Sequence, residues 1–123
     1  MFSLRRLLKS FKYAIWGLNK VFWEEQNFRI DFVIAFFILF FSVYFRIRVW
    51  EFIILILIIA LVLILEIVNS IFERLLDLLK PRIHQYVKDI KDMTAAAVFI
   101  GALASVLIGI LIFLPYIVNK FFK

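Results

Sequence analysis

The chain of 123 residues is 66% hydrophobic, whereas a soluble domain is roughly 45 to 50% apolar, so a soluble fold is excluded and a single membrane domain is predicted. The net charge of +6 does not indicate nucleic-acid binding, because the basic residues flank apolar runs as membrane orientation signals do. The chain has no cysteine, which excludes disulfides and thiolate metal sites.

The segment 1–26 is predicted to be an amphipathic helix that lies on the membrane surface. Its apolar residues recur at steps of three and four, and Lys and Arg residues are interleaved with them. These cations would lie near acidic lipid headgroups. A cleaved signal peptide is the alternative for such a start, but no short uncharged core with a small-residue cleavage site precedes Glu24.

Three further segments are predicted to cross the membrane, at 28–48, 50–79 and 92–118. The second contains 14 uncharged apolar residues from Phe52 to Leu65 and then continues as a polar extension into the cytoplasm. The third is uncharged for 24 residues from Ala95 to Val118. We therefore expect an all-α membrane protein with one surface helix and three transmembrane helices per subunit.

The distribution of cations predicts the orientation in the membrane. Of the 15 Lys and Arg residues, 11 lie up to Arg29 or between Arg74 and Lys91. By the positive-inside rule these parts and the N-terminus are cytoplasmic, and the C-terminus lies outside. We expect a multi-pass membrane protein.

Small residues recur every four positions in the third apolar segment, at Ala97, Gly101, Ser105 and Gly109. Such a stripe allows another backbone to approach closely and predicts a helix-packing face. A ligand role for Ser105 is the alternative.

The polar residues after Leu65 form the most informative pattern of the chain. At 3.6 residues per turn, one helical stripe contains Glu66, Asn69, Ser70, Glu73 and Asp77. Glu66 lies nearest the apolar run, where a carboxylate costs roughly 2.5 to 3.5 kcal/mol to insert, so an acid there indicates function. Simple interhelical hydrogen bonding is the alternative for Glu66 and Asn69, and a solvated helix end is the alternative for Glu73 and Asp77.

Two more polar clusters are expected at the same membrane depth, Glu24 to Arg29 and Lys91-Asp92. Carboxylates that converge from separate helices could hold Mg²⁺ together with phosphate oxygens. A nearby lysine would neutralise a phosphoryl group in transfer. No Walker sequence is present, which excludes the familiar nucleotide folds. Lys91 and Asp92 could instead be ordinary interface anchors, and the single histidine, His84, could be simply solvated.

These polar residues resemble a known family, the small prokaryotic lipid kinases that include diacylglycerol kinase and the undecaprenol kinase of Gram-positive bacteria. The most specific part is Glu66-x-x-Asn69-Ser70-x-x-Glu73-x-x-x-Asp77, which is similar to the family's E-x-x-N-[ST]-x-x-E-x-x-x-D pattern. The supporting pieces are Ser10-Phe11-Lys12-Tyr13-Ala14, Glu25-x-Asn27-Phe28-Arg29-Ile30, Pro81-x-x-His84, Lys91-Asp92 and Phe113-Leu114-Pro115.

The resemblance implies a homotrimer with active sites shared between subunits, which transfers the γ-phosphoryl group of ATP to a lipid hydroxyl. It implies Glu66 as the general base, Glu25 and Glu73 as the residues that hold Mg²⁺, and Asn69 and Asp77 as residues that order the site. The implied ATP-binding residues are Arg6, Tyr13, Glu25, Glu73, Arg82, His84, Lys91 and Asp92. The implied lipid-binding residues are Asn27, Arg29 and Ala95.

The chain departs from the family pattern at a few positions. Asp31 stands where undecaprenol kinases usually have His and diacylglycerol kinases have Glu, Ile71 replaces a small residue, and Thr94 to Ala97 lacks a common glycine. The resemblance favours undecaprenol as the acceptor, with diacylglycerol as the alternative. A non-catalytic membrane subunit or small transporter, in which the acidic stripe relays protons or pairs with a partner's cations, is the alternative from another class.

Overall fold

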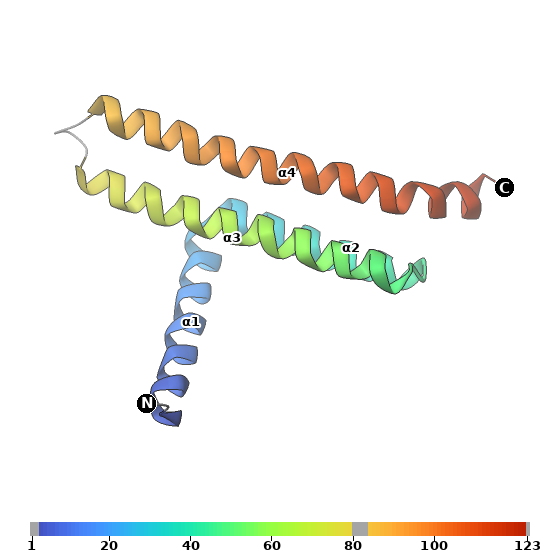
Figure 1. Cartoon of the computed structure of the whole chain (residues 1–123), viewed down its shortest axis with the longest axis horizontal. Coiled ribbons are helices and arrows are strands. Elements are labelled where there is room, and N and C mark those ends of the chain that lie inside the picture. Colours follow the sequence, from blue (N-terminus) through green and yellow to red (C-terminus); the bar gives the residue numbers. More distant parts are fainter. Residues whose placement is uncertain (1–2, 80–83, 123) are drawn as a thin grey trace.

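The computed structural model describes residues 3–79 and 84–122, and every regular element in these two ranges is a helix. The helices are α1 (Leu4–Glu24), α2 (Gln26–Tyr44), α3 (Val49–Leu79) and α4 (His84–Phe121). Helices α2, α3 and α4 run lengthwise along one another, whereas α1 projects from them at a steep angle (Figure 1). The expected all-α fold class is confirmed for the described residues.

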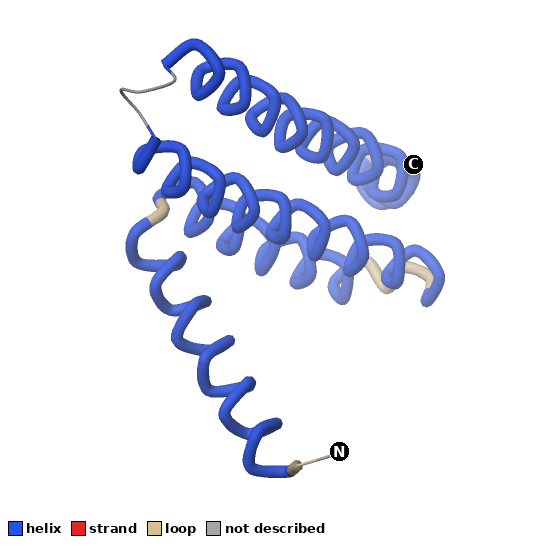
Figure 2. Tube along the Cα trace, turned by 60° about the vertical axis from the view of Figure 1, so that its left-hand side comes forward, coloured by secondary structure: helices blue, strands red, loops and turns tan. Residues whose placement is uncertain are grey.

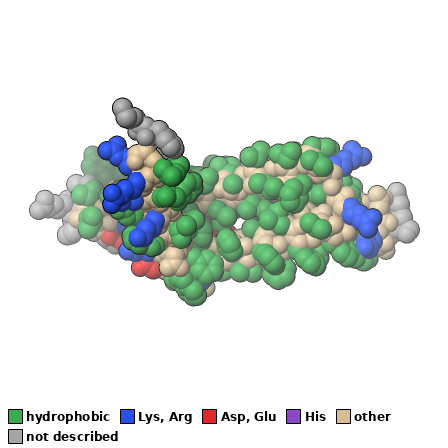
Figure 3. Space-filling view, turned by 90° about the horizontal axis from the view of Figure 1, so that it is seen from below, with side chains coloured by type: hydrophobic (Ala, Val, Ile, Leu, Met, Phe, Trp, Pro, Cys, Tyr) green, Lys and Arg blue, Asp and Glu red, His purple; other side chains and the backbone are tan. Residues whose placement is uncertain are grey.

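Three of these helices, α2, α3 and α4, are long and apolar enough to cross a membrane. Most of their large apolar side chains point outward, including Phe36, Leu57 and Leu111, which are 66%, 64% and 74% exposed. The space-filling view shows an apolar surface along the three helices, with the basic side chains gathered toward the two ends (Figure 3). An exposed apolar surface of this extent needs lipid or another subunit to cover it.

Helices α3 and α4 lie side by side in both ribbon views (Figures 1 and 2). Their contact uses one member of the predicted small-residue stripe, because a Cβ atom added at Gly101 would lie 2.6 Å from Cδ1 of Leu65. A Cβ atom added at Gly109 would meet nothing within 4 Å. The stripe therefore packs on α3 near Gly101 and opens toward Gly109.

The junction between α1 and α2 is a single extended residue, Glu25, with φ −112° and ψ 109°. Ser3 caps the start of α1, where its hydroxyl accepts from the Arg6 backbone N–H at 3.4 Å. At the other end, Nη1 of Arg29 donates to the carbonyl of Phe22 at 3.1 Å and to that of Trp23 at 2.7 Å. These two bonds satisfy carbonyls of the last turn of α1 and so fix the junction.

The helices differ from the predicted segments mainly at their ends. Helix α1 ends at Glu24 rather than at residue 26, because Glu25 is extended. Helix α2 ends at Tyr44, four residues before the predicted limit of 48, because Arg46 adopts the left-handed conformation with φ 52°. Helix α4 begins at His84 rather than at residue 92. Its first turns carry exposed polar residues, and periodicity of apolar residues alone does not reveal such an extension.

Candidate functional site

Glu66 interacts electrostatically with three other carboxyl groups, which come from α2, from the α1–α2 junction and from α3 itself. Glu66 lies on α3 and is partly buried, and the carboxyl group with which it interacts most strongly is that of Asp31 on α2. Glu25, at the α1–α2 junction, and Glu73, two turns along α3, are near enough to interact electrostatically with Glu66. Like charges at this separation repel unless a cation or a proton lies among them. The cluster therefore suits chemistry that needs both a bound cation and a transferred proton.

A cation of the same chain is bound at the edge of this cluster. Nη2 of Arg74 lies 2.9 Å from Oε2 of Glu24 and 3.4 Å from Oε1 of Glu25. Arg74 follows Glu73 directly, so this bridge brings the α1–α2 junction against the acidic stripe of α3. One of the two predicted metal carboxylates, Glu25, is thus already paired within the single chain.

Asn69 connects the stripe along α3. Its amide Nδ2 donates to Oε1 of Glu73 at 3.2 Å, and its Oδ1 is buried without a hydrogen-bond partner among the described residues. A buried amide oxygen without a partner costs about 1 to 3 kcal/mol, which a ligand could relieve. Ser70 is buried, and its hydroxyl donates to the Glu66 carbonyl within the helix at 3.1 Å, so this bond is local.

The start of α4 adds a lysine to the polar extension of α3. Nζ of Lys91 lies 2.9 Å from Oδ1 of Asp77. The neighbouring Asp92 accepts a hydrogen bond from Lys88 at 3.0 Å, and the Asp92 carboxylate raises the pKa of the Lys88 ammonium group above its ordinary value. The Lys91–Asp77 ion pair thus brings the predicted Lys91-Asp92 cluster of α4 next to the polar stripe of α3. Asp92, in contrast, pairs with Lys88 of its own helix.

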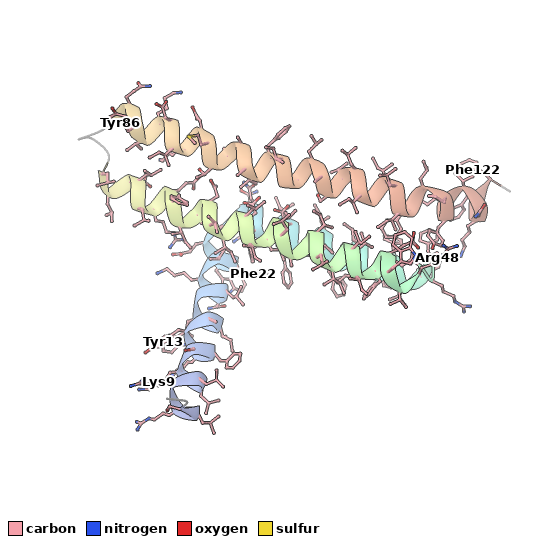
Figure 4. The ribbon with its side chains drawn as sticks, viewed as in Figure 1. Lys9, Tyr13, Phe22, Arg48, Tyr86 and Phe122 are labelled. Carbon is pink, nitrogen blue, oxygen red and sulfur yellow. The ribbon has the colours of Figure 1, made fainter. Side chains whose placement is uncertain are left out.

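Several predicted site residues do not meet the carboxyl cluster in the single chain. Arg6 and Tyr13 lie on α1, and the labelled Tyr13 lies far along the part of α1 that projects from the other helices (Figure 4). Asn27 and Ala95 are exposed, and the guanidinium of Arg29 is bound to backbone carbonyls of α1. Of the remaining two predicted contacts, Arg82 lies outside the described residues, and His84 is described only as the first residue of α4.

Within residues 3–79 and 84–122, no three His, Cys, Asp or Glu side chains are gathered closely enough to form a metal site by themselves. The donor chemistry still suits Mg²⁺. This ion prefers oxygen ligands and is bound in kinase sites by one or two carboxylates plus substrate phosphates, so a complete protein cage is not required. Glu25, Glu73 and the unpartnered Oδ1 of Asn69 supply oxygens of that kind.

Sequence reasoning missed the roles of Asp31 and Arg74. Asp31 is the one acid within the predicted segment 28–48, and the cost of an acid inside a membrane segment was a signal for it. Arg74 gave no such signal, because it lies beside the acidic stripe and its partner Glu25 is distant in sequence.

Comparisons with known proteins identify the family of the chain. A family model described as prokaryotic diacylglycerol kinase matches residues 12–113. The chain is 34% identical over 113 residues to undecaprenol kinase of Bacillus subtilis (strain 168), a match that covers 92% of each chain. It is 32% identical over 110 residues to diacylglycerol kinase of Synechocystis sp., covering 89% of this chain and 63% of that relative. The chain therefore belongs to the prokaryotic diacylglycerol kinase family, a family of lipid kinases.

Proposed function

We propose that the protein transfers the γ-phosphoryl group of ATP to the hydroxyl group of undecaprenol in the bacterial inner membrane. Diacylglycerol is the second candidate acceptor. The first rests on the relative named undecaprenol kinase, which matches over 92% of its length, and the second on the relative named diacylglycerol kinase. The observation that carries the proposal is the meeting of Glu66 with Asp31, Glu25 and Glu73 at the end of an apolar run.

The position of Glu66 suits a general base for a lipid alcohol. The acceptor hydroxyl is held in the membrane and ATP is in water, so the two can meet only at the boundary between them. Glu66 follows the apolar residues Phe52 to Leu65, and Glu73 lies seven residues further, about 10 Å along the helix axis. In the proposed step, the Glu66 carboxylate takes the proton of the lipid hydroxyl. The lipid oxygen bonds to the γ-phosphorus of ATP, the bond between that phosphorus and the bridging oxygen breaks, and ADP leaves.

The nucleotide would lie on the aqueous side of Glu66. Glu25, Glu73 and Asn69 would hold Mg²⁺, which in kinases neutralises charge between phosphate oxygens. Lys91, held near the stripe by Asp77, would interact with the phosphates. Asp92, His84 and Arg82 would complete the nucleotide contacts, since α4 starts at the cytoplasmic end of α3.

The remaining predicted contacts require a second subunit. Arg6 and Tyr13 lie on α1, which projects from the other helices of its own chain, so they would serve the site of a neighbour in a homotrimer (Figure 1). Helix α1 would lie on the cytoplasmic membrane surface, with its Lys and Arg residues near lipid headgroups.

Asn27, Arg29 and Ala95 would line the path of the lipid. The N-terminus would be cytoplasmic and the C-terminus outside.

The test is to supply labelled ATP and Mg²⁺ with undecaprenol or diacylglycerol in mixed micelles and to measure the phosphate on each lipid. We expect transfer to undecaprenol to be faster, and we expect the substitution Glu66→Gln to abolish both reactions. Faster transfer to diacylglycerol would reassign the acceptor. If neither lipid gains phosphate, the alternative of a non-catalytic membrane subunit or transporter takes precedence.

A further inference from the structure

A second polar site lies at the end of the helices opposite the carboxyl cluster, where the α2–α3 turn meets the end of α4. It consists of two recesses of about 600 Å³ and 450 Å³, which share Arg46, Tyr116 and Asn119 and so adjoin one another. Lys120 lines the first and Arg48 the second. The labelled Arg48 marks this end of the molecule in Figure 4. We call the two together the basic recess.

The basic recess carries positive charge that its own acid does not neutralise. Within the described part of the chain, none of the four ion pairs involves Arg46, Arg48 or Lys120. Nζ of Lys120 lies 3.9 Å from the centre of the Tyr44 ring, which stabilises the cation and leaves its donors available. Three cations thus surround a space large enough to admit an anionic group.

The one acid of the recess, Glu51, is buried and is held in place through one of its carboxylate oxygens. Glu51 is only 8% exposed, and its Oε1 accepts hydrogen bonds from the Tyr116 hydroxyl and, at 3.0 Å, from the Arg48 backbone N–H. These bonds tie the first turn of α3 both to the preceding turn and to α4. Glu51 therefore fixes the walls of the recess, and the guanidinium groups of Arg46 and Arg48 remain for a ligand.

The backbone of the turn is also held in a costly conformation. Arg46 has φ 52°, which costs a residue other than glycine roughly 1 to 2 kcal/mol. Hydrogen bonds from the Arg46 N–H to the Val43 carbonyl at 3.1 Å and from the Ile47 N–H to the Ser42 carbonyl at 3.2 Å maintain it. These two bonds are those of a Schellman motif at the end of α2, so they fix the backbone position of Arg46 at the mouth of the recess.

We propose that the basic recess binds the phosphate group of an anionic phospholipid. Guanidinium groups bind phosphate through two parallel hydrogen bonds, and Arg46 and Arg48 supply two such groups. The recess lies at the end of the apolar surface, where a phospholipid places its phosphate. Tyr44 and Tyr116 line it, and tyrosine is enriched at this depth. The neighbouring Val43 and Val49 are 71% and 76% exposed and would contact the acyl chains.

The proposal is tested by titrating the full-length protein in detergent with phosphatidylglycerol and counting bound lipids by native mass spectrometry. We expect a bound phosphatidylglycerol, at least tenfold weaker binding of phosphatidylcholine, and at least tenfold weaker binding of phosphatidylglycerol by the double variant Arg46→Gln/Arg48→Gln. The matched control, Arg74→Gln/Lys88→Gln, also removes two charges but at the opposite end of the helices, from residues paired with carboxylates, so its tightest binding should equal that of the unaltered protein.

The same titration can overturn the proposal in two ways. An equal loss of affinity in the double variant and the control would show that only total charge matters. Inorganic phosphate that displaces phosphatidylglycerol at equal concentration would show that the recess takes a soluble anion. The thermal unfolding midpoint of each variant without lipid separates lost binding from lost folding. Catalytic turnover does not enter this readout, so it stands apart from the proposed kinase function.

Discussion

Arg74 of α3 bridges Glu24, the last residue of α1, and Glu25, which joins α1 to α2, at 2.9 Å and 3.4 Å. The bridge is about half exposed, with 47% of the Arg74 side chain and 49% of the Glu24 side chain accessible. An exposed pair of this type contributes little to stability, because solvent screens it. Its larger effect is on Glu25, because a bound guanidinium would compete with the proposed metal ion for the same carboxylate.

The substitution Arg74→Gln should therefore reduce the Mg²⁺ concentration needed for half-maximal phosphoryl transfer. Glu25 would lose a competing cation, and we expect a shift of about threefold, with a thermal unfolding midpoint close to that of the unaltered protein. The measurement is initial rate against Mg²⁺ at saturating ATP. Lys9→Gln, which removes a cation on α1, is the control. An increased Mg²⁺ requirement would instead mean that Arg74 positions Glu25.

Replacement of Glu66 by Gln should separate activity from stability. The variant lacks the proposed base, and we expect turnover to fall by about 10² to 10⁴-fold. Its fold should be retained or slightly stabilised, since neutralising Glu66 removes repulsion with Asp31, Glu25 and Glu73. Turnover and thermal unfolding are measured on the same preparation. A variant that keeps its turnover would exclude Glu66 as the base.

The Lys91–Asp77 pair should matter more for ATP than for folding. The two groups are 2.9 Å apart, but the Asp77 side chain is 61% exposed, so a double-mutant cycle with Lys91→Gln and Asp77→Asn should give a coupling energy below about 1 kcal/mol. Lys91→Gln alone should raise the KM for ATP about tenfold, because a cation near the phosphates is lost. Lys88→Gln is the matched control on α4. A coupling above about 2 kcal/mol with unchanged KM would make the pair purely structural.

The two glycines of the α4 stripe should respond differently to alanine. Gly109→Ala gains helix propensity of up to about 1 kcal/mol and meets no atom within 4 Å, so it should stabilise the chain. Gly101→Ala makes the same gain but forces Cδ1 of Leu65 to move from 2.6 Å, so its net effect should be smaller or unfavourable. The thermal unfolding midpoints of the two variants in detergent test this. A lower midpoint for Gly109→Ala would place another subunit against that face.

The acidic stripe of α3 could be predicted from the sequence because it depends only on the period of one helix. Glu66, Asn69 and Glu73 share a face wherever that helix lies. The long apolar runs likewise indicated the three helices that could cross a membrane.

The contacts between helices required the structure. The Arg74 bridge depends on the extended conformation of Glu25, and the contact of Glu66 with Asp31 depends on how α2 lies against α3. Neither the conformation of one residue nor the rotation of one helix about its axis follows from apolar periodicity.

The end of α2 was also misplaced for a physical reason. The residues after Tyr44 remain aromatic and basic as far as Arg48, so composition gave no sign of the left-handed turn at Arg46. A glycine there would have indicated the turn.

The junction of α1 and α2 is one residue long, and that residue carries a carboxylate of the proposed metal site. Any tilt of α1, a helix of 21 residues, would therefore be transmitted directly to Glu25 in the proposed metal site. If α1 rests on the bilayer, then changes in curvature or lateral pressure would tilt the helix and displace that carboxylate. The physical state of the membrane would then influence the proposed phosphoryl transfer through the position of Glu25.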